Sequence, residues 1–172
     1  MSTTEKNMKR ITILLTSYGD TFGKFICHVS KPPYSHASLS IDENEDIFYS
    51  FNYKGFVIEK PKKYRPKKRL PENVCIRMQV PENIYRLIEA EIDRFTAHKG
   101  QLMYARLGVL LCLLHIPHQF KNRYFCSQFV AEILERTGAI TLQKKGSLYL
   151  PGQLLDGFDC LFSAKELVYN VI

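Results

Sequence analysis

The chain has 172 residues, 45% of them hydrophobic, and a formal net charge of +7. A chain of this length buries roughly 70% of its unfolded surface, so we expect one domain, residues 1–172. The N-terminus is polar, unlike a signal peptide, and the longest apolar stretch, 107–114, is far shorter than the ~18 residues of a membrane span. We therefore expect a cytoplasmic protein whose residues 1–9 form a flexible N-terminus.

The five cysteines are scattered along the chain. An odd number at irregular spacing predicts free thiols in a reducing compartment. No pair has the C-x-x-C spacing, and no histidine–cysteine cluster has the spacing of zinc ligands. We therefore expect neither a metal nor another cofactor.

The excess positive charge lies in one segment, Lys60–Arg69, which holds seven basic residues. Without these seven, 17 basic residues remain against 17 acidic ones. The segment contains prolines and is predicted to be an exposed loop, either simply solvated or in contact with anionic lipid head groups or other polyanions. Specific nucleic-acid binding is not expected, because Tyr64 is the only aromatic residue there and no binding motif surrounds it.

Strand-like and helix-like stretches are both present, which predicts an α+β domain. Buried or alternating patterns predict strands at 10–16, 35–42, 46–52, 55–59, 74–80 and 166–171. Helical spacing predicts helices at 21–29, 81–98, 102–116 and within 122–138. The stretch 102–116 is apolar almost all round, which is typical of a packed interior helix. The helix at 81–98 has an apolar stripe made by Ile84, Leu87, Ile88, Ile92 and Phe95.

Residues 35–52 are predicted to form a hairpin with a three-residue loop at 43–45. Alternation predicts an apolar face made by three cross-strand pairs, Ala37–Phe51, Leu39–Tyr49 and Ile41–Ile47. The opposite face then carries His36 across from Asn52, and Ser38 across from Ser50. An amide or hydroxyl next to a histidine can orient its imidazole ring. The hairpin therefore supplies a candidate base with two candidate partners, Asn52 and Ser50.

The helix within 122–138 carries the candidate nucleophile. Its buried stripe is formed by Phe129, Val130, Ile133 and Leu134. Asn122 is a candidate N-cap, and Gly138 is a candidate C-terminal stop. Cys126 would lie in the first turn, where the helix dipole favours a thiolate. The alternative is that Cys126 is a small buried core residue, the usual state of a free cysteine.

A cysteine at a helix start and a histidine on a strand are the two parts of a thiol nucleophile. The imidazole of His36 would accept the proton of Cys126, and a third polar group would hold the ring. The backbone N–H of Cys126 would stabilise the oxyanion together with a second donor, for which Tyr34 and Tyr104 are candidates.

Two segments, Tyr-Ser-His-Ala-Ser-Leu-Ser-Ile-Asp at 34–42 and Phe-Cys-Ser-Gln-Phe-Val-Ala-Glu-Ile-Leu at 125–134, resemble one family. This is the circularly permuted NlpC-like branch of the papain-like cysteine hydrolases, which includes YiiX-type proteins and lecithin:retinol acyltransferases. There the histidine strand precedes the cysteine helix. Leu-Pro-Gly-Gln-Leu at 150–154 is similar to the Pro-x-x-Leu element that follows this helix in YiiX-type members.

The resemblance implies a papain-like antiparallel sheet packed against helices, with Cys126 as nucleophile and His36 as base. At the third position Asn52 would match the asparagine of papain, with Ser50 as the alternative. The sequence departs from members that have a second histidine or an acid on that strand.

The leading hypothesis is a thiol hydrolase that cleaves an amide bond, in a peptide or a peptidoglycan-type fragment, through an acyl-enzyme. One alternative is acyl transfer or hydrolysis on an acyl-lipid substrate, which the apolar 102–116 stretch and the basic loop would suit. The other is a non-catalytic binding domain of the same fold.

Overall fold

The computed structural model of the chain describes residues 7–17, 21–29, 32–61 and 72–171. Residues 1–6, expected to be flexible, and Lys62–Arg69, most of the basic segment, lie outside the described residues. The first strand begins at Met8, so Met8 and Lys9 belong to the sheet and not to a flexible terminus.

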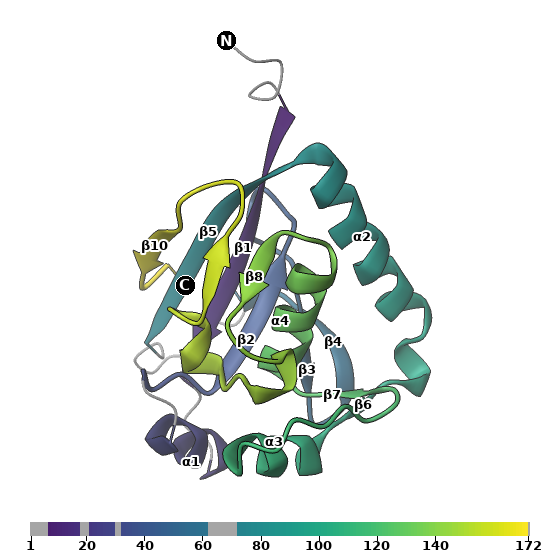
Figure 1. Cartoon of the computed structure of the whole chain (residues 1–172), viewed down its shortest axis with the longest axis vertical. Coiled ribbons are helices and arrows are strands. Elements are labelled where there is room, and N and C mark those ends of the chain that lie inside the picture. The colour runs from purple at the N-terminus through teal and green to yellow at the C-terminus, as the bar shows by residue number, and fades with distance from the viewer. Residues whose placement is uncertain (1–6, 18–20, 30–31, 62–71, 172) are drawn as a thin grey trace.

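The main sheet is antiparallel and has six strands in the order β10-β5-β1-β2-β3-β4 (Figure 1). Its strands are β1 (Met8–Thr16), β2 (His36–Ser40), β3 (Phe48–Asn52), β4 (Gly55–Glu59), β5 (Asn73–Pro81) and β10 (Glu166–Tyr169). As predicted, the sheet ends with a strand from the C-terminal part of the chain, which pairs with β5.

Four α-helices lie within the described residues: α1 (Thr21–Val29), α2 (Glu82–Ala97), α3 (Arg106–Leu113) and α4 (Cys126–Arg136). Two small sheets join β6 (Met103–Tyr104) to β7 (Arg123–Tyr124), and β8 (Ile140–Leu142) to β9 (Phe158–Cys160). Three short 3-10 helices are η3 (Lys99–Gln101), η4 (Gly146–Leu148) and η5 (Pro151–Leu154). This arrangement confirms an α+β fold with an antiparallel sheet. No helix in the described part of the chain has both the length and the apolar run that a bilayer crossing needs.

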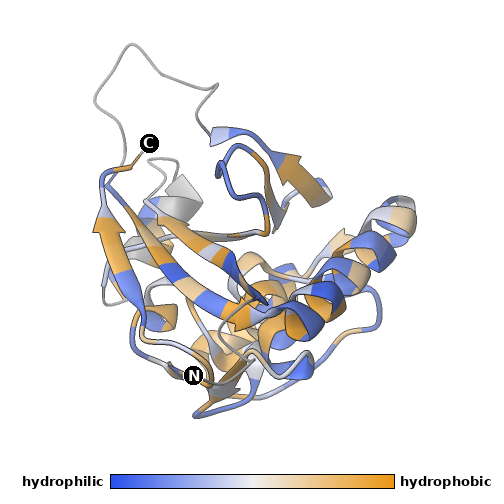
Figure 2. Ribbon diagram, turned by 90° about the horizontal axis from the view of Figure 1, so that it is seen from above, coloured by the Kyte–Doolittle hydropathy of each residue, from blue (hydrophilic) through white to orange (hydrophobic). Residues whose placement is uncertain are grey.

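The core lies between the sheet and two helices, α4 and α2. Hydrophilic and hydrophobic residues alternate along the strands and along α2 (Figure 2), so each element has one side suited to burial. The ring of Phe129 on α4 lies 5.3 Å from Phe51, 5.6 Å from Phe56 and 5.0 Å from Phe95. These edge-on and tilted contacts tie α4 to β3, β4 and α2 and hold it on the sheet.

The hairpin of β2 and β3 has the predicted register, because Leu39 pairs with Tyr49. Ala37, Leu39 and Phe51 are fully buried, as the apolar face required. The strands are shorter than predicted, since β2 ends at Ser40 and β3 begins at Phe48. The turn between them contains Glu45 in a left-handed conformation, with φ of 54°.

That turn directs the Glu45 carboxylate into the protein, where it is 4% exposed. It accepts hydrogen bonds from Arg77 of β5 through Nε at 2.6 Å and Nη2 at 2.7 Å, and from Thr12 of β1 at 2.9 Å. Burial alone would raise the pKa of Glu45, but the hydrogen bonds from Arg77 and Thr12 and the charge of Arg77 lower it. This ion pair joins the turn to the middle of the sheet.

The predicted helix over 102–116 is present as α3, but it is shorter than predicted and is not interior. Met103 and Ala105 donate their N–H groups to the carbonyls of Asn122 and Tyr124, so the chain first runs as strand β6 and α3 starts only at Arg106. The outer side of α3 is exposed, with Leu107 at 55% and Leu110 at 52%. Leu87 of α2 was also expected in the core and is 51% exposed, whereas Ile88, Ile92 and Phe95 are buried. An apolar sequence therefore did not mean that these side chains are covered by the rest of the protein.

Candidate active site

The helix α4 begins at Cys126 itself. Pairing of β7 with β6 keeps the preceding residues extended, and Phe125 is the N-cap residue with φ of −106° and ψ of 165°. The prediction that Asn122 caps the helix is therefore wrong; Asn122 lies four residues earlier, in a left-handed turn with φ of 55°. The end of the helix is as predicted, because Gly138 has φ of 76° and donates to the carbonyl of Glu135.

The first turn of α4 is held from several sides. Cys126, Ser127 and Gln128 are 4%, 0% and 1% exposed. The hydroxyl of Ser127 donates to the carbonyl of Tyr149 at 2.6 Å, and the amide of Gln128 donates to the Glu132 carboxylate at 2.9 Å. Cys126 is therefore carried by a rigid element, as a positioned nucleophile requires.

His36 is the first residue of β2, where the strand pairs with the last residue of β1, Thr16. The histidine is 7% exposed, and its ring forms a side-chain hydrogen bond with Cys126. On the other side, Nε2 lies 3.0 Å from both carboxylate oxygens of Glu59, the last residue of β4. Because the carboxylate occupies Nε2, we assign the thiol contact to Nδ1. The imidazole thus bridges the thiol and the carboxylate.

Glu59 determines the charge state of His36. Burial by itself would lower the pKa of His36, since it penalises the imidazolium. The negative charge of Glu59, together with the hydrogen bonds to Cys126 and Glu59, outweighs burial and raises the pKa well above its ordinary value of 6.5. The ring is therefore a stronger base than a free imidazole, and it lies next to the sulfur of Cys126.

The two residues predicted to orient His36 make other hydrogen bonds. Ser50 is buried and donates its hydroxyl to the carbonyl of Ala37 at 2.6 Å. The side-chain oxygen of Asn52 accepts the backbone N–H of Lys54 at 2.9 Å, within the turn from β3 to β4. Sequence reasoning missed Glu59, although it placed a strand over 55–59. The available signal was an acidic residue at the end of the strand that follows the hairpin.

An acyl-transfer site also needs donors for an oxyanion. As the first residue of α4, Cys126 has a backbone N–H with no acceptor inside the helix. Tyr104 of β6 pairs with Tyr124 of β7, two residues before Cys126. Tyr34 is 8% exposed and lies two residues before His36; burial, then the charges of Tyr169 and Glu72, raise its pKa. The raised pKa keeps Tyr34 a neutral hydrogen-bond donor at neutral pH.

The other described cysteines have the environment of core residues. Cys75 and Cys112 are buried, and Cys160 is partly buried. Burial raises the pKa of Cys112 to about 11, against a small opposing effect of Lys144, and also raises the pKa of Cys160. A thiol with a raised pKa is a poor nucleophile at neutral pH. Among these four described thiols, Cys126 is the one that the structure pairs with a histidine.

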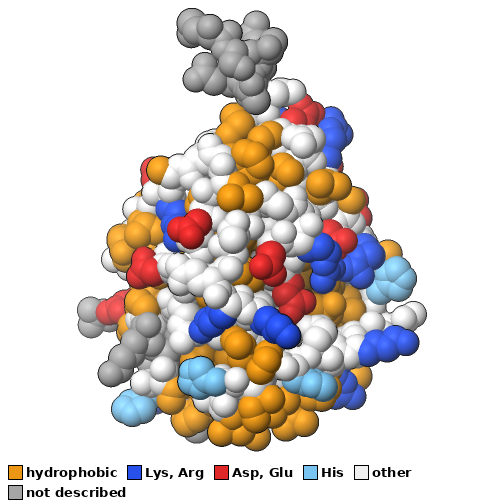
Figure 3. Space-filling view, in the orientation of Figure 1, with side chains coloured by type: hydrophobic (Ala, Val, Ile, Leu, Met, Phe, Trp, Pro, Cys, Tyr) orange, Lys and Arg blue, Asp and Glu red, His pale blue; other side chains and the backbone are white. Residues whose placement is uncertain are grey.

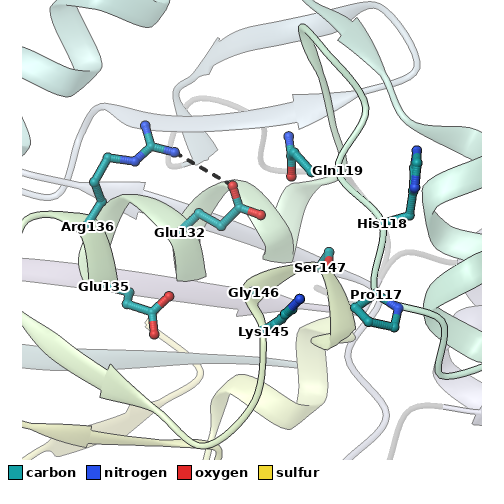
Figure 4. Close-up of a pocket in the computed structure, with 9 residues that line it drawn as sticks. All are labelled: Pro117, His118, Gln119, Glu132, Glu135, Arg136, Lys145, Gly146 and Ser147. Atoms are coloured by element: carbon teal, nitrogen blue, oxygen red, sulfur yellow. Dashed lines mark ion pairs between the residues drawn. The ribbon is translucent and has the colours of Figure 1, made fainter.

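Two surface cavities have walls that do not include Cys126, His36 or Glu59. One, of about 470 Å³, lies over the polar side of α4 and is bounded by Glu132, Glu135 and Arg136 on one side and by Lys145–Ser147 on the other (Figure 4). The second, of about 730 Å³, lies between the β3–β4 turn and the start of α3 and includes Gly55, which pairs with Asn52.

Comparison with known proteins leaves the family open. No protein-family model matches the chain, and no curated protein matches it significantly.

Proposed function

We propose that the protein is a cysteine hydrolase in which Cys126 is the nucleophile, His36 the general base and acid, and Glu59 the residue that orients His36. The observation that carries this proposal is the position of the His36 ring, which is hydrogen-bonded to the Cys126 thiol and to the Glu59 carboxylate. This is the order of groups in a thiol triad, with a carboxylate in the third place.

In the proposed reaction His36 takes the proton of the Cys126 thiol, and the sulfur attacks the carbonyl carbon of the substrate. The oxyanion that forms is stabilised by the backbone N–H of Cys126 and by a second donor. Collapse of the tetrahedral intermediate breaks the carbon–nitrogen bond, and His36 gives its proton to the leaving amine. Water, deprotonated by His36, then attacks the thioester, which releases the carboxylic acid and restores the thiol.

The proposed substrate is an amide bond in a peptide or a peptidoglycan-type fragment, and the proposed compartment is the cytoplasm. We also propose the circularly permuted NlpC-like form of the papain-like fold. Three features support this form: the histidine strand β2 precedes the cysteine helix α4, α4 packs on an antiparallel sheet, and the short helix η5 follows with the Pro-x-x-Leu element.

A second candidate is acyl transfer or hydrolysis on a lipid ester by the same residues. The observation that favours it is the exposed apolar side of α3, which packs through Val109 and Cys112 in the same cluster as Phe125, the residue before Cys126. Incubating the protein with lipid and peptide substrates and weighing the trapped acyl-enzyme separates the two. A fatty-acyl mass on Cys126 would exclude amide cleavage as the main activity.

The proposal as a whole is tested by labelling the folded protein with iodoacetamide at neutral pH and quantifying each cysteine by mass spectrometry. We expect Cys126 to label at least about tenfold faster than Cys75, Cys112 and Cys160, because a thiolate is the reacting form. Cys126→Ala should remove the fast phase, while Cys112→Ala, the matched control, should keep it. Equal rates for all thiols would exclude a catalytic cysteine and leave a binding domain.

A further inference from the structure

The helices α1 and α3 form one end of the molecule (Figure 1). They pack against each other through a small cluster that contains Ile26 of α1, Val109 and Cys112 of α3, and Phe125. The two helices and the turn after α3 carry large apolar side chains between 37% and 59% exposed, which are Phe25 and Val29 of α1, Leu107 and Leu110 of α3, and Leu114 and Ile116 just after it. We call these six residues the α1–α3 face. Hydrophobic side chains gather at this end of the space-filling view, over α3 (Figure 3).

Such a face is unusual for a surface exposed only to water. Single apolar residues on a surface need no explanation, but a group of leucines on one helix marks a contact with another molecule. Gly108 shows that α3 is held firmly in this position, because a Cβ there would lie 3.0 Å from Ala105 and 3.4 Å from the Phe125 ring. The exposed side of α3 is therefore a fixed surface, since its inner side is already packed.

Within the described segments that carry this face, 21–29 and 106–116, every charged side chain is basic. The segments 21–41 and 94–131, which contain both helices, hold no aspartate or glutamate. Among the described residues, Lys24, Arg106, Lys121 and Arg123 are exposed beside the face. An apolar surface edged by cations complements a bilayer that carries anionic head groups.

The larger of the two cavities lies at the edge of the same face. Its volume is about 730 Å³, and its wall shares Leu107 with the face and adds the side chains of Met103, Arg106, Lys54 and Arg123. None of the described residues that line it is acidic. Three cations beside apolar side chains suit a phosphate group next to an acyl chain.

We propose that the α1–α3 face docks on an anionic phospholipid surface, with Leu107, Leu110 and Leu114 inserted among the acyl chains. Arg106, Arg123 and Lys54 then contact head-group phosphates at the edge of the face. The proposal is independent of catalysis by Cys126. In the docked protein α3 would lie between the lipid and Phe125, the residue before α4.

The test is sedimentation of the full-length protein with vesicles of phosphatidylcholine alone and of equimolar phosphatidylcholine and phosphatidylglycerol. We expect binding to the mixed vesicles that weakens as salt is raised, because exposed charges are screened. The double variant Leu107→Ser, Leu110→Ser should bind about a hundredfold more weakly, since each buried leucine contributes roughly tenfold. The matched control is Leu87→Ser, which removes an equally exposed leucine from α2 and should bind as the unchanged protein does.

Arg106→Gln with Arg123→Gln should weaken binding to the mixed vesicles and leave any binding to phosphatidylcholine alone unchanged. Cys126→Ala should bind vesicles as the unchanged protein does. Vesicle binding therefore tests docking independently of the proposed thiol chemistry. The proposal is overturned if the unchanged protein binds neither vesicle, if it forms a stable dimer that the leucine variants dissolve, or if the folded leucine double variant still binds fully.

Discussion

Two carboxylates, buried Glu45 and partly buried Glu59, each bind a basic side chain at the main sheet, and the two basic side chains differ in whether they can lose a proton. Glu45 is held by Arg77, whose pKa is raised by the hydrogen bond to Glu45 and which stays charged at any physiological pH. Glu59 is held by His36, which can lose its proton in the range where proteins work. The first pair also includes Thr12, whereas the second includes the Cys126 thiol.

The comparison shows that a buried ion pair is not by itself a candidate site. Glu45 and Arg77 join a turn to a strand, and Arg77 keeps its charge at neutral pH. In the pair of Glu59 and His36, the same kind of contact raises the pKa of a titratable ring next to the Cys126 thiol. The two pairs differ in their basic residue, Arg77 or His36, and in the third group, the Thr12 hydroxyl or the Cys126 thiol.

The largest effect is expected from removing the titratable base. His36→Ala should lower hydrolysis by about a thousandfold, since a positioned general base contributes roughly 10²–10⁴-fold. It should also slow alkylation of Cys126, measured by mass spectrometry at neutral pH. Arg77→Met is the matched control in the other pair, and the alkylation rate of its folded fraction should not change. Equal alkylation in His36→Ala and the unchanged protein would remove His36 from the mechanism.

The next effect concerns stability and belongs to the other pair. Glu45→Gln leaves Arg77 without its carboxylate partner, and breaking a buried pair in this way costs about 3 kcal/mol. The free energy of unfolding, measured with urea, should fall by that amount while labelling of Cys126 in the folded protein stays fast. A variant with unchanged stability would show that the Glu45 pair contributes nothing to the fold.

The smallest effect is expected from Glu59→Gln, which keeps a hydrogen-bond acceptor for His36 and removes the charge. Without that charge the pKa of His36 should fall toward its ordinary value of 6.5. Labelling of Cys126 at neutral pH should then slow by about tenfold, because a less basic imidazole takes the thiol proton in fewer molecules. Titration of the His36 ring by NMR gives the pKa directly, and an unshifted value would remove Glu59 from its proposed role.

The two pairs should also respond to pH with opposite signs. The folded pKa of His36 is raised, so the stability from Glu59 is complete below the unfolded value of 6.5 and is lost as pH rises through the folded value. The folded pKa of Glu45 is lowered, so its stability is complete above the unfolded value of 4.5 and is lost as pH falls through the folded value. Urea unfolding of Glu59→Gln and Glu45→Gln against the unchanged protein, at acidic and alkaline pH, measures both.

Local patterns predicted the parts of the fold that depend on neighbouring residues. Alternation along 35–52 gave the pairing of Leu39 with Tyr49, because a shift by one residue would have turned the apolar face outward. Gly138 predicted the end of α4, because few other residues adopt its positive φ. These patterns did not predict the pairing of β6 with β7. Because of that pairing, α3 begins only at Arg106 and α4 only at Cys126.

The third partner of the candidate site could not be predicted for a related reason. Glu59 lies 23 residues from His36, on a strand whose own pairing is with β3. Its contact with His36 depends on the order and curvature of the whole sheet, which no local pattern records. Likewise, the apolar residues of 102–116 were predicted to lie in the core. The sequence shows that a side chain is hydrophobic, but it does not show whether another element covers that side chain.

The helix α4 both covers the sheet and carries Cys126, which has a consequence for the chain during its synthesis. The ribosome adds 67 residues between Glu59 and Cys126, which takes about 3 to 13 s at the usual rate of synthesis. Until then Ala37, Leu39 and Phe51 lack the helix that covers them, and the imidazole lacks its thiol. The packing of α4 on the sheet therefore both closes the core and brings Cys126 to His36, so a nascent chain with a finished core already has the thiol beside the histidine.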